Sequence, residues 1–225
     1  MYIAIETATR TSSVAVLDGD RFTEINLDSR LTHSQTLRPQ LEEAIRLSGA
    51  PRGAGIEGIA VSIGPGSFTG LRIGLSAAKA LSYAWGVPIA GVPTLEALSM
   101  NFPFDRVLTM LDAQRDCAYF QIFDRTKALD EVKVGSIEKI MSEAEKFDGL
   151  ITVCGDALKK IKTLPSNVAL APINLRMPRA VNVGVLGRRR ITAGLVDNVM
   201  NLEPKYVRRS EAEVLWEKRH AASER

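Results

Sequence analysis

The sequence predicts an α/β protein made of two copies of one unit, in which a β-meander is followed by a buried strand and a helix. Two observations predict this fold. Apolar runs separated by polar turns open the chain over residues 2–27, and the same pattern returns over residues 107–134. The apolar run at 58–64 also has a counterpart, at 149–155. The repeat lies in the order of the elements rather than in the letters, and it implies two mixed sheets.

Composition places the chain among globular proteins. Its 225 residues are 45% hydrophobic and 24% charged, which is enough to bury one large domain or two small ones. The net charge of +3 permits a nucleic-acid partner without requiring one. Cys117 and Cys154 are too few for a disulfide framework, so a reducing compartment fits. Because the start turns polar early and no apolar run reaches the roughly 18 residues of a membrane span, we expect a cytoplasmic protein with no membrane partner.

The elements of the first unit follow from apolar runs and turn residues. Strands are expected at residues 2–5, 13–17, 21–27, 58–63 and 87–90. A helix follows Thr32 and continues to about Leu47, where Gly49 ends it. One face of this helix carries Leu37, Leu41, Ala44 and Ile45. We place the first unit at residues 1–103.

The second unit begins as the first does. Strands are expected at residues 107–111, 117–123, 129–134 and 149–155. Aligning the two first strands places one carboxylate at the end of each, Glu6 in the first unit and Asp112 in the second. A helix is expected at residues 180–195, and its later turns contain Arg188-Arg189-Arg190. We place this unit at residues 104–203.

Residues 204–225 form a separate C-terminal segment. Pro204 keeps the residues around it extended, because proline is excluded from a helix interior. A capping box at Ser210-Glu211-Ala212-Glu213 opens a last helix. This helix presents Val214, Leu215 and Trp216, and we expect it to pack back on the first unit.

The stretch 64–74, with the helix that continues to Trp85, is the centre of the first unit. Its Gly64-Pro65-Gly66 turn reverses the chain after a buried strand, and Ser67 or Thr69 caps the helix. The helix is apolar over an arc of about 280°, whereas a helix on one sheet needs about 100°. We therefore expect it to pack on its own sheet and also against a partner. A helix wrapped on all sides by its own domain is the alternative.

Five stretches, in the same order along the chain, carry a family resemblance. They are Ile5-Glu6-Thr7-Ala8-Thr9, His33-Ser34-Gln35-Thr36-Leu37-Arg38-Pro39, the whole of 64–74, Gly91-Val92-Pro93-Thr94-Leu95 and Pro204-Lys205-Tyr206-Val207-Arg208. With them the chain resembles the bacterial TsaB family, also called YeaZ. The resemblance implies two actin-like (ribonuclease H-like) subdomains. It also implies a role in forming threonylcarbamoyladenosine next to the anticodon of tRNA.

The resemblance also implies what this chain lacks. The related catalytic subunit, TsaD, carries Gly-Val-Asn-His-x-x-x-His, whose two histidines hold a metal, but Thr94 and Leu98 stand at those positions here. Leucine is no metal ligand and threonine is a poor one. We therefore expect no metal, no catalytic residue and no cofactor on this chain, with ATP used by the complex. The expected role is a non-catalytic partner or activating subunit. The alternative is an actin-like ATP-dependent enzyme or a glycoprotease-like metallopeptidase that acts on its own.

The implied partners are a TsaD-like catalytic subunit, a TsaE-like ATPase, tRNA through the complex, and a second copy of the chain when it is alone. We expect the interface on the two long helices of the first unit, at Thr36, Leu37, Gln40, Leu41, Ala44, Thr69, Arg72, Ile73, Ser76, Ala77 and Ala80. A vestigial nucleotide cleft is expected at Glu6, Thr7 and Asp112. The turns after these residues lack the glycines that expose backbone N–H groups to phosphates.

Several single features have two interpretations each. Glu6 is either a solvated carboxylate at a strand end or one that caps the turn. His33 beside Ser34 suggests a base and nucleophile, but an N-terminal helix cap fits adjacent residues better. The arginine run at 188–190 either contacts tRNA phosphates or forms a solvated face. The polar stripe of the central helix faces either the partner or water, and it consists of Arg72, Ser76, Lys79 and Tyr83.

Overall fold

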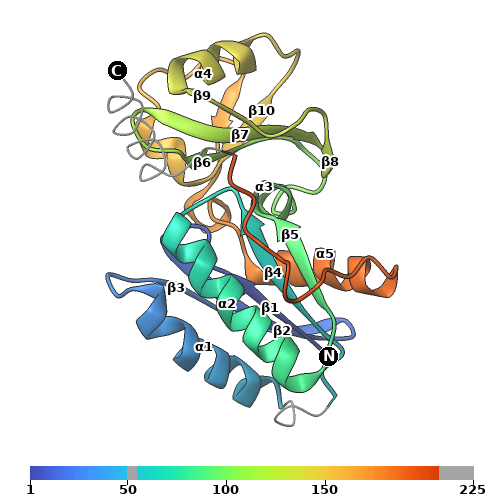
Figure 1. Cartoon of the computed structure of the whole chain (residues 1–225). Coiled ribbons are helices and arrows are strands. Elements are labelled where there is room, and N and C mark those ends of the chain that lie inside the picture. Colours follow the sequence, from blue (N-terminus) through green and yellow to red (C-terminus); the bar gives the residue numbers. More distant parts are fainter. Residues whose placement is uncertain (50–54, 208–225) are drawn as a thin grey trace, which may run out of the picture.

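The computed structural model describes residues 1–49 and 55–207, which form two lobes, each built on one β-sheet (Figure 1). The first sheet has the order β3-β2-β1-β4-β5. Its strands are β1 (Tyr2–Glu6), β2 (Thr11–Asp18), β3 (Arg21–Asp28), β4 (Gly58–Gly64) and β5 (Ile89–Pro93). The meander β1 to β3 pairs antiparallel, whereas β1, β4 and β5 are parallel, so the sheet is mixed as the sequence predicts.

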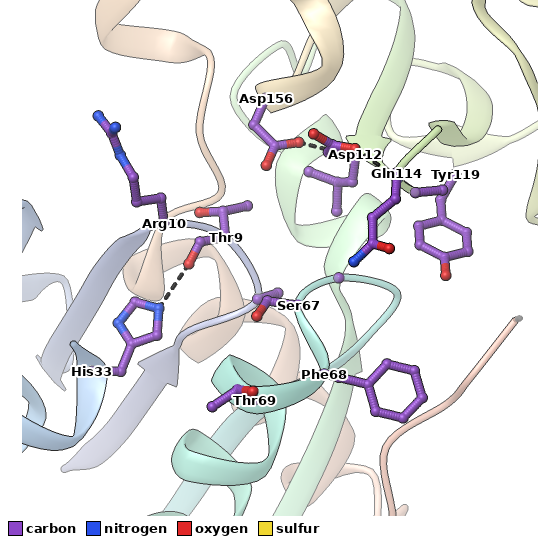
Figure 2. A pocket seen from close by; sticks show the side chains of 14 residues that line it. Thr9, Arg10, His33, Ser67, Phe68, Thr69, Asp112, Gln114, Tyr119 and Asp156 are labelled. Atoms are coloured by element: carbon purple, nitrogen blue, oxygen red, sulfur yellow. Dashed lines mark hydrogen bonds between the residues drawn. The ribbon is translucent and has the colours of Figure 1, made fainter. Parts of the chain in front are cut away.

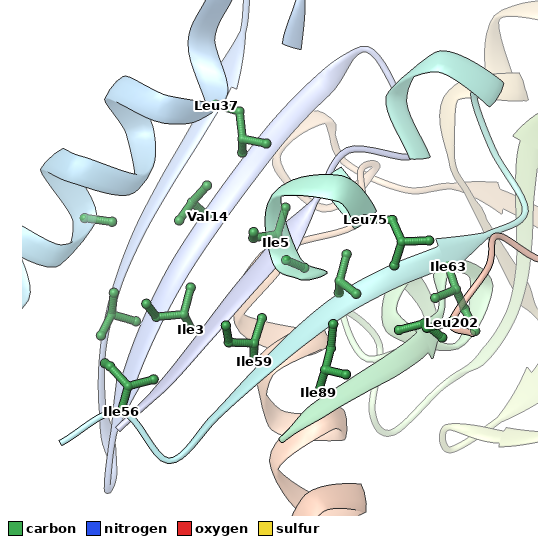
Figure 3. Packing of buried hydrophobic residues seen from close by; sticks show 14 residues of the cluster. Ile3, Ile5, Val14, Leu37, Ile56, Ile59, Ile63, Leu75, Ile89 and Leu202 are labelled. Carbon is green, nitrogen blue, oxygen red and sulfur yellow. The ribbon is translucent and has the colours of Figure 1, made fainter. Parts of the chain in front are cut away.

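Helices cover both faces of the first sheet. On one face lie α1 (His33–Ser48) and α2 (Phe68–Trp85), and on the other lies α5 (Ala180–Thr192). Alternate residues of β1 serve the two faces, because side chains alternate along a strand. Ile3 and Ile5 pack under α1 and α2 (Figure 3), while Tyr2 and Ala4 pack under α5. Burial on both faces explains why this strand is apolar without alternation.

Helix α5 packs on the first sheet, although it follows the second lobe in sequence. Its contacts are with β1, β2, β4 and β5. Gly184 and Gly187 permit the close approach, since an added Cβ would overlap Leu17 or Ala60. Residues 180–192 were expected in the second unit, at 104–203, but they pack with the first lobe. The helix also ends at Thr192, earlier than the expected 195.

The second lobe repeats the first in strand order. Its strands are β6 (Arg106–Asp112), β7 (Cys117–Asp124), β8 (Lys127–Ala128), β9 (Lys133–Ser136), β10 (Ile151–Cys154) and β11 (Val168–Leu170). They follow the order β11-β10-β6-β7-β8, with β9 also on β7, and β6, β10 and β11 are parallel. The expected repeat is confirmed, but the strand predicted at 129–134 is wrong, because the chain forms two short strands around that stretch. Sequence reasoning also missed α4 (Ile137–Glu145) and β11.

Short helices complete the structure. A six-residue helix, α3 (Thr94–Ser99), joins the lobes, and two 3-10 helices, η1 (Asp156–Lys160) and η2 (Ile173–Leu175), lie in the second lobe. Between the parallel strands β10 and β11, η1 takes the place that α2 has between β4 and β5. Within the part of the chain that is described, no helix has the length and apolar character needed to cross a bilayer. The predicted capping box at 210–213 and the helix after it lie outside the described residues.

Candidate functional site

The turn between β4 and α2 is fixed against the end of β1. Ser67 is the N-cap of α2, as predicted, and its Oγ accepts a hydrogen bond from the Gly70 amide at 3.2 Å. The Ser67 amide donates to the Ala8 carbonyl at 2.7 Å, and Thr7 Oγ1 donates to the Gly70 carbonyl at 2.8 Å. A Cβ on Gly70 or Gly74 would overlap Thr7. The glycines of the 64–74 stretch therefore let the start of α2 lie directly on the first strand's turn.

One face of α2 is exposed to solvent. The helix buries Gly70, Leu71, Gly74, Leu75, Ala78 and Ser82 against its sheet, and part of its flank contacts α1. Ile73 and Ala77 are half-buried at the edge of the core. The residues that remain exposed are Thr69, Arg72, Ser76, Ala80, Tyr83 and Ala84. We call this set the open face of α2. Within residues 1–49 and 55–207 the helix is thus neither enclosed by its own lobe nor apolar over its whole open side.

The polar stripe of α2 is partly occupied by the chain itself. Lys79 Nζ donates to the carbonyls of Met200 and Leu202, at 3.0 and 3.2 Å. Arg72 Nε donates to the Tyr206 hydroxyl at 3.0 Å. Two of the four stripe residues thus hold the C-terminal segment, an outcome that neither sequence interpretation anticipated. Ser76 and Tyr83 of the stripe are exposed.

The residues of α1 that were expected in the interface face inward. Thr36, Leu37, Gln40 and Ala44 are buried, and Leu41 is half-buried, because α1 packs on β2 and β3. Gln40 accepts a hydrogen bond from Ser12 Oγ at 2.6 Å, which satisfies a buried amide. Buried side chains have no surface to offer a partner. These four buried residues therefore form a packing surface inside the subunit, and the interface on α1 stays a prediction, for which Leu41 is the expected residue that keeps exposed surface.

A cleft of about 500 Å³ lies between the lobes, beside the start of α2 (Figure 2). The ends of β1 and β6 and the turn before α2 form its walls. Its lining residues are Ala8, Thr9, Arg10, His33, Gly66, Ser67, Phe68, Thr69, Leu111, Asp112, Ala113, Gln114, Tyr119 and Asp156. Of the three residues expected in a vestigial nucleotide cleft, only Asp112 lines it. Glu6 and Thr7 are fully buried beneath its wall.

Glu6 is a buried carboxyl group that caps the first turn. Its Oε1 accepts the Ala8 amide at 2.5 Å, as the capping interpretation predicts. The solvated interpretation is wrong, because the side chain has no exposed surface. Burial raises the pKa of Glu6 to about 7, although the hydrogen bond from the Ala8 amide and the nearby Ser62 hydroxyl lower it.

Asp112 faces two lysines rather than an open cation site. Lys160 Nζ lies 2.6 Å from one carboxylate oxygen and Lys159 Nζ lies 3.3 Å from the other. Burial raises the pKa of Asp112, but hydrogen bonds from Lys160, the Gln114 amide and Lys159 outweigh burial and hold the pKa below its usual range. The Asp112 amide donates to Asp156 at 2.7 Å. Sequence reasoning missed Asp156, although it comes two residues after the end of β10, much as Asp112 ends β6.

His33 joins the first turn to the start of α1. Its Nε2 donates to the Thr9 carbonyl at 2.8 Å, since a carbonyl only accepts. His33 is not the helix cap, because Thr32 holds that position and its amide donates to the Gln35 side chain. The histidine is thus engaged by backbone at the edge of the cleft, and Ser34 is not its partner there.

The two positions that the resemblance assigns to metal ligands lie in the core. Thr94 and Leu98, both on α3, are fully buried. Thr94 Oγ1 accepts the Gly64 amide at 3.1 Å, so it stabilises the turn before α2. Among the described side chains, no group of three or more His, Cys, Asp or Glu comes together. The site as described thus offers no cluster of strong ligands.

The arginine run and the cysteines also have defined places. Arg188 is half-buried and donates to the Gly19 carbonyl at 2.7 Å, and Arg190 is half-buried too, which leaves only Arg189 exposed. The interpretation of residues 188–190 as one solvated face is therefore wrong, because two of the three arginines are half-buried.

Both cysteines are free. Cys154 is buried, whereas Cys117 is half-exposed.

Comparison with known proteins agrees with this geometry. A family model described as TsaD, tRNA N6-adenosine threonylcarbamoyltransferase, matches residues 28–216. The chain is 27% identical over 227 residues to the tRNA threonylcarbamoyladenosine biosynthesis protein TsaB of Bacillus subtilis, which covers 95% of this chain and 96% of that protein. The Haemophilus influenzae TsaB is 26% identical over 235 residues, with 96% and 95% covered. The chain belongs to the TsaD family, in its TsaB (YeaZ) branch.

Solved structures of the TsaB branch have the same fold. YeaZ from Pseudomonas aeruginosa superimposes with a TM-score of 0.75 at 22% identity, over 92% of this chain and 99% of that one. Two lobes with mixed sheets of matching order are the architecture that the resemblance implies. The prediction of two actin-like subdomains is therefore confirmed.

Proposed function

We propose that the chain is a non-catalytic partner subunit of the assembly that forms threonylcarbamoyladenosine in tRNA. Support comes from the family model and from relatives named for this biosynthesis. The observation that carries the proposal is the state of the former ligand positions. Thr94 and Leu98 belong to the core, yet the chain still matches the TsaD family model over residues 28–216. A subunit that keeps the fold without the ligands is suited to binding and activating a related catalytic subunit.

The open face of α2 is the proposed partner surface. Its small side chains, Thr69, Ser76 and Ala80, permit a helix of the partner to approach closely, and Tyr83, with 75% of its surface exposed, supplies a large anchor. We propose that a TsaD-like catalytic subunit docks here, with Ile73 and Ala77 at the rim. The same face supports a dimer of the chain when the partner is absent.

The cleft between the lobes is not part of the proposed partner surface. Two lysines neutralise Asp112, which leaves it a poor holder for magnesium, so we propose that the chain binds no cofactor and that ATP is used by the complex. A TsaE-like ATPase and tRNA are the further proposed partners. We also propose a cytoplasmic location, which fits a role in tRNA modification and the two free cysteines. The second candidate is an ATP-dependent enzyme of the actin-like class. The 500 Å³ cleft between the lobes favours it.

Three experiments test the proposal. Depleting the protein and measuring tRNA nucleosides by mass spectrometry should show loss of threonylcarbamoyladenosine; an unchanged level would refute the role. Complementation with Ala80→Arg, which places a charge on the open face, should fail to restore the nucleoside. Ala128→Arg, a matched change at an exposed alanine of β8, should restore it. A phosphate-release assay on the purified chain separates the candidates, because sustained ATP hydrolysis would favour the enzyme.

A further inference from the structure

The last described residues lie beside α2, with a turn at 199–201 followed by residues without regular secondary structure at 202–206. We call residues 198–207 the strap. It runs antiparallel to the helix, since Met200 and Leu202 meet Lys79, whereas Tyr206 meets the first turns of α2. Leu202 is buried in the core of the first lobe. The Lys205 amide donates to the Ile63 carbonyl at 2.7 Å, which fixes the strap to the end of β4.

Tyr206 is the strap residue with the most specific contacts. Its ring stacks on Phe68 with the centroids 4.0 Å apart and the planes 3° from parallel. The Arg72 guanidinium lies 5.4 Å from the Phe68 centroid and 5.9 Å from the Tyr206 centroid, and it also donates to the Tyr206 hydroxyl. One tyrosine thus holds a ring and a guanidinium that are one helical turn apart on α2.

The start of α2 has few other contacts of this kind. Phe68 is the first residue of the helix and is only half-buried, so the core does not fix its ring. The Ser67 cap and the hydrogen bonds with Thr7 and Ala8 hold the backbone of this turn, whereas the contact that holds the Phe68 ring is its stack on Tyr206. Phe68 lines the cleft on one side and carries Tyr206 on the other. The open face begins one residue later, at Thr69.

We propose that Tyr206 is a positioning residue for the partner surface: it holds the first turns of α2 in one orientation, so that the open face is presented to the partner already ordered. This inference rests on the proposed function, and it adds to the surface a residue that does not belong to α2. A surface that is ordered before binding loses less conformational freedom on association. A purely structural role for Tyr206 would stabilise the chain and leave the affinity for the partner unchanged.

The test uses the full chain in three variants. Tyr206→Ala removes the ring, and Tyr206→Phe keeps the stack while removing the hydroxyl. Phe104→Ala is the control, because it also removes an aromatic ring, at a site in the loop before β6 that is 85% exposed. Each variant is measured for its melting temperature, for amide hydrogen exchange over residues 68–72, and for its dissociation constant with the TsaD-like subunit by titration calorimetry.

Tyr206→Ala should raise the dissociation constant about tenfold and speed exchange in the first turns of α2, since one stacked and one cation–π contact are lost. Tyr206→Phe should stay within about threefold of the unmodified chain, as should Phe104→Ala. A lower melting temperature with unchanged affinity would show a structural role only and overturn the proposal. Unchanged exchange in Tyr206→Ala would overturn it too.

The same titrations distinguish the two proposals. If the unmodified chain binds and Ala80→Arg does not, while Tyr206→Ala binds normally, the open face is the partner surface and only the role of Tyr206 is lost. If the unmodified chain fails to bind the TsaD-like subunit, the proposed function fails and this inference fails with it. In that case exchange over residues 68–72 reports only on the order of the free helix.

Discussion

Glu6→Gln should remove a pH dependence from the stability of this protein. Glu6 Oε1 accepts the Ala8 amide, but Oε2 has no hydrogen-bond partner among the residues described, and neither has Ser62 Oγ on the neighbouring strand β4. Ionising a carboxyl group in such a place is costly. The pKa of Glu6 is raised to about 7 in the folded chain, from 4.5 for an unperturbed glutamate. Glutamine keeps the shape of the protonated acid and carries no charge at any pH.

The magnitude follows from the two pKa values. Below pH 4.5 both states of the chain hold the Glu6 proton, so its stabilising contribution is fully present. Between 4.5 and about 7 only the folded state keeps the proton, and stability falls as the pH rises. Above about 7 neither state holds it and the loss is complete. At about 1.4 kcal/mol per unit the total loss is about 3 kcal/mol, or roughly 6 to 12 °C in melting temperature.

The assay is urea or thermal unfolding of both proteins from pH 4.5 to 8.5. Other titrating groups affect both proteins alike, so the informative quantity is the difference in unfolding free energy between them. Glutamine also buries an amide, which adds a constant offset and no pH dependence. The difference should therefore change by about 3 kcal/mol in favour of Glu6→Gln as the pH rises. Parallel curves for the two proteins across this range would show that Glu6 causes no pH dependence of the stability.

Two further predictions concern packing and thiol reactivity. Gly74→Ala should lower the free energy of unfolding by about 1 kcal/mol, because its Cβ overlaps Thr7 at a cost that exceeds the gain in helix propensity. Gly135→Ala, where a Cβ makes ordinary contacts, is the control in the same denaturation assay; equal losses in both variants would contradict the overlap. In the native chain a thiol reagent should modify Cys117 well before Cys154, since Cys154 is buried and burial raises the pKa of its thiol. Equal rates for both cysteines would show that Cys154 is accessible.

Local sequence determined most of the elements in this protein. The three strands of the first meander, the first two strands of the second, the buried strand 58–64, the bounds of α1 and α2 and the Ser67 cap all follow from residues close together in the chain. Apolar runs, turn glycines and capping hydroxyls act over a few residues, so their effects can be predicted from the order of residues in the chain. The weak metal-binding capacity of Thr94 and Leu98 could also be predicted, since residue type alone excludes strong ligation.

The tertiary structure decided everything that depends on contacts between distant residues. The burial of α1 residues, the packing of α5 on the first sheet and the neutralisation of Asp112 by Lys159 and Lys160 each join segments that lie far apart in sequence. On a helical wheel Arg72 and Lys79 look like free surface charges, yet both side chains donate hydrogen bonds to the strap. A helical pattern states which residues share a face. Only the folded chain determines what covers that face, because apolar burial has no direction and accepts any segment that fits.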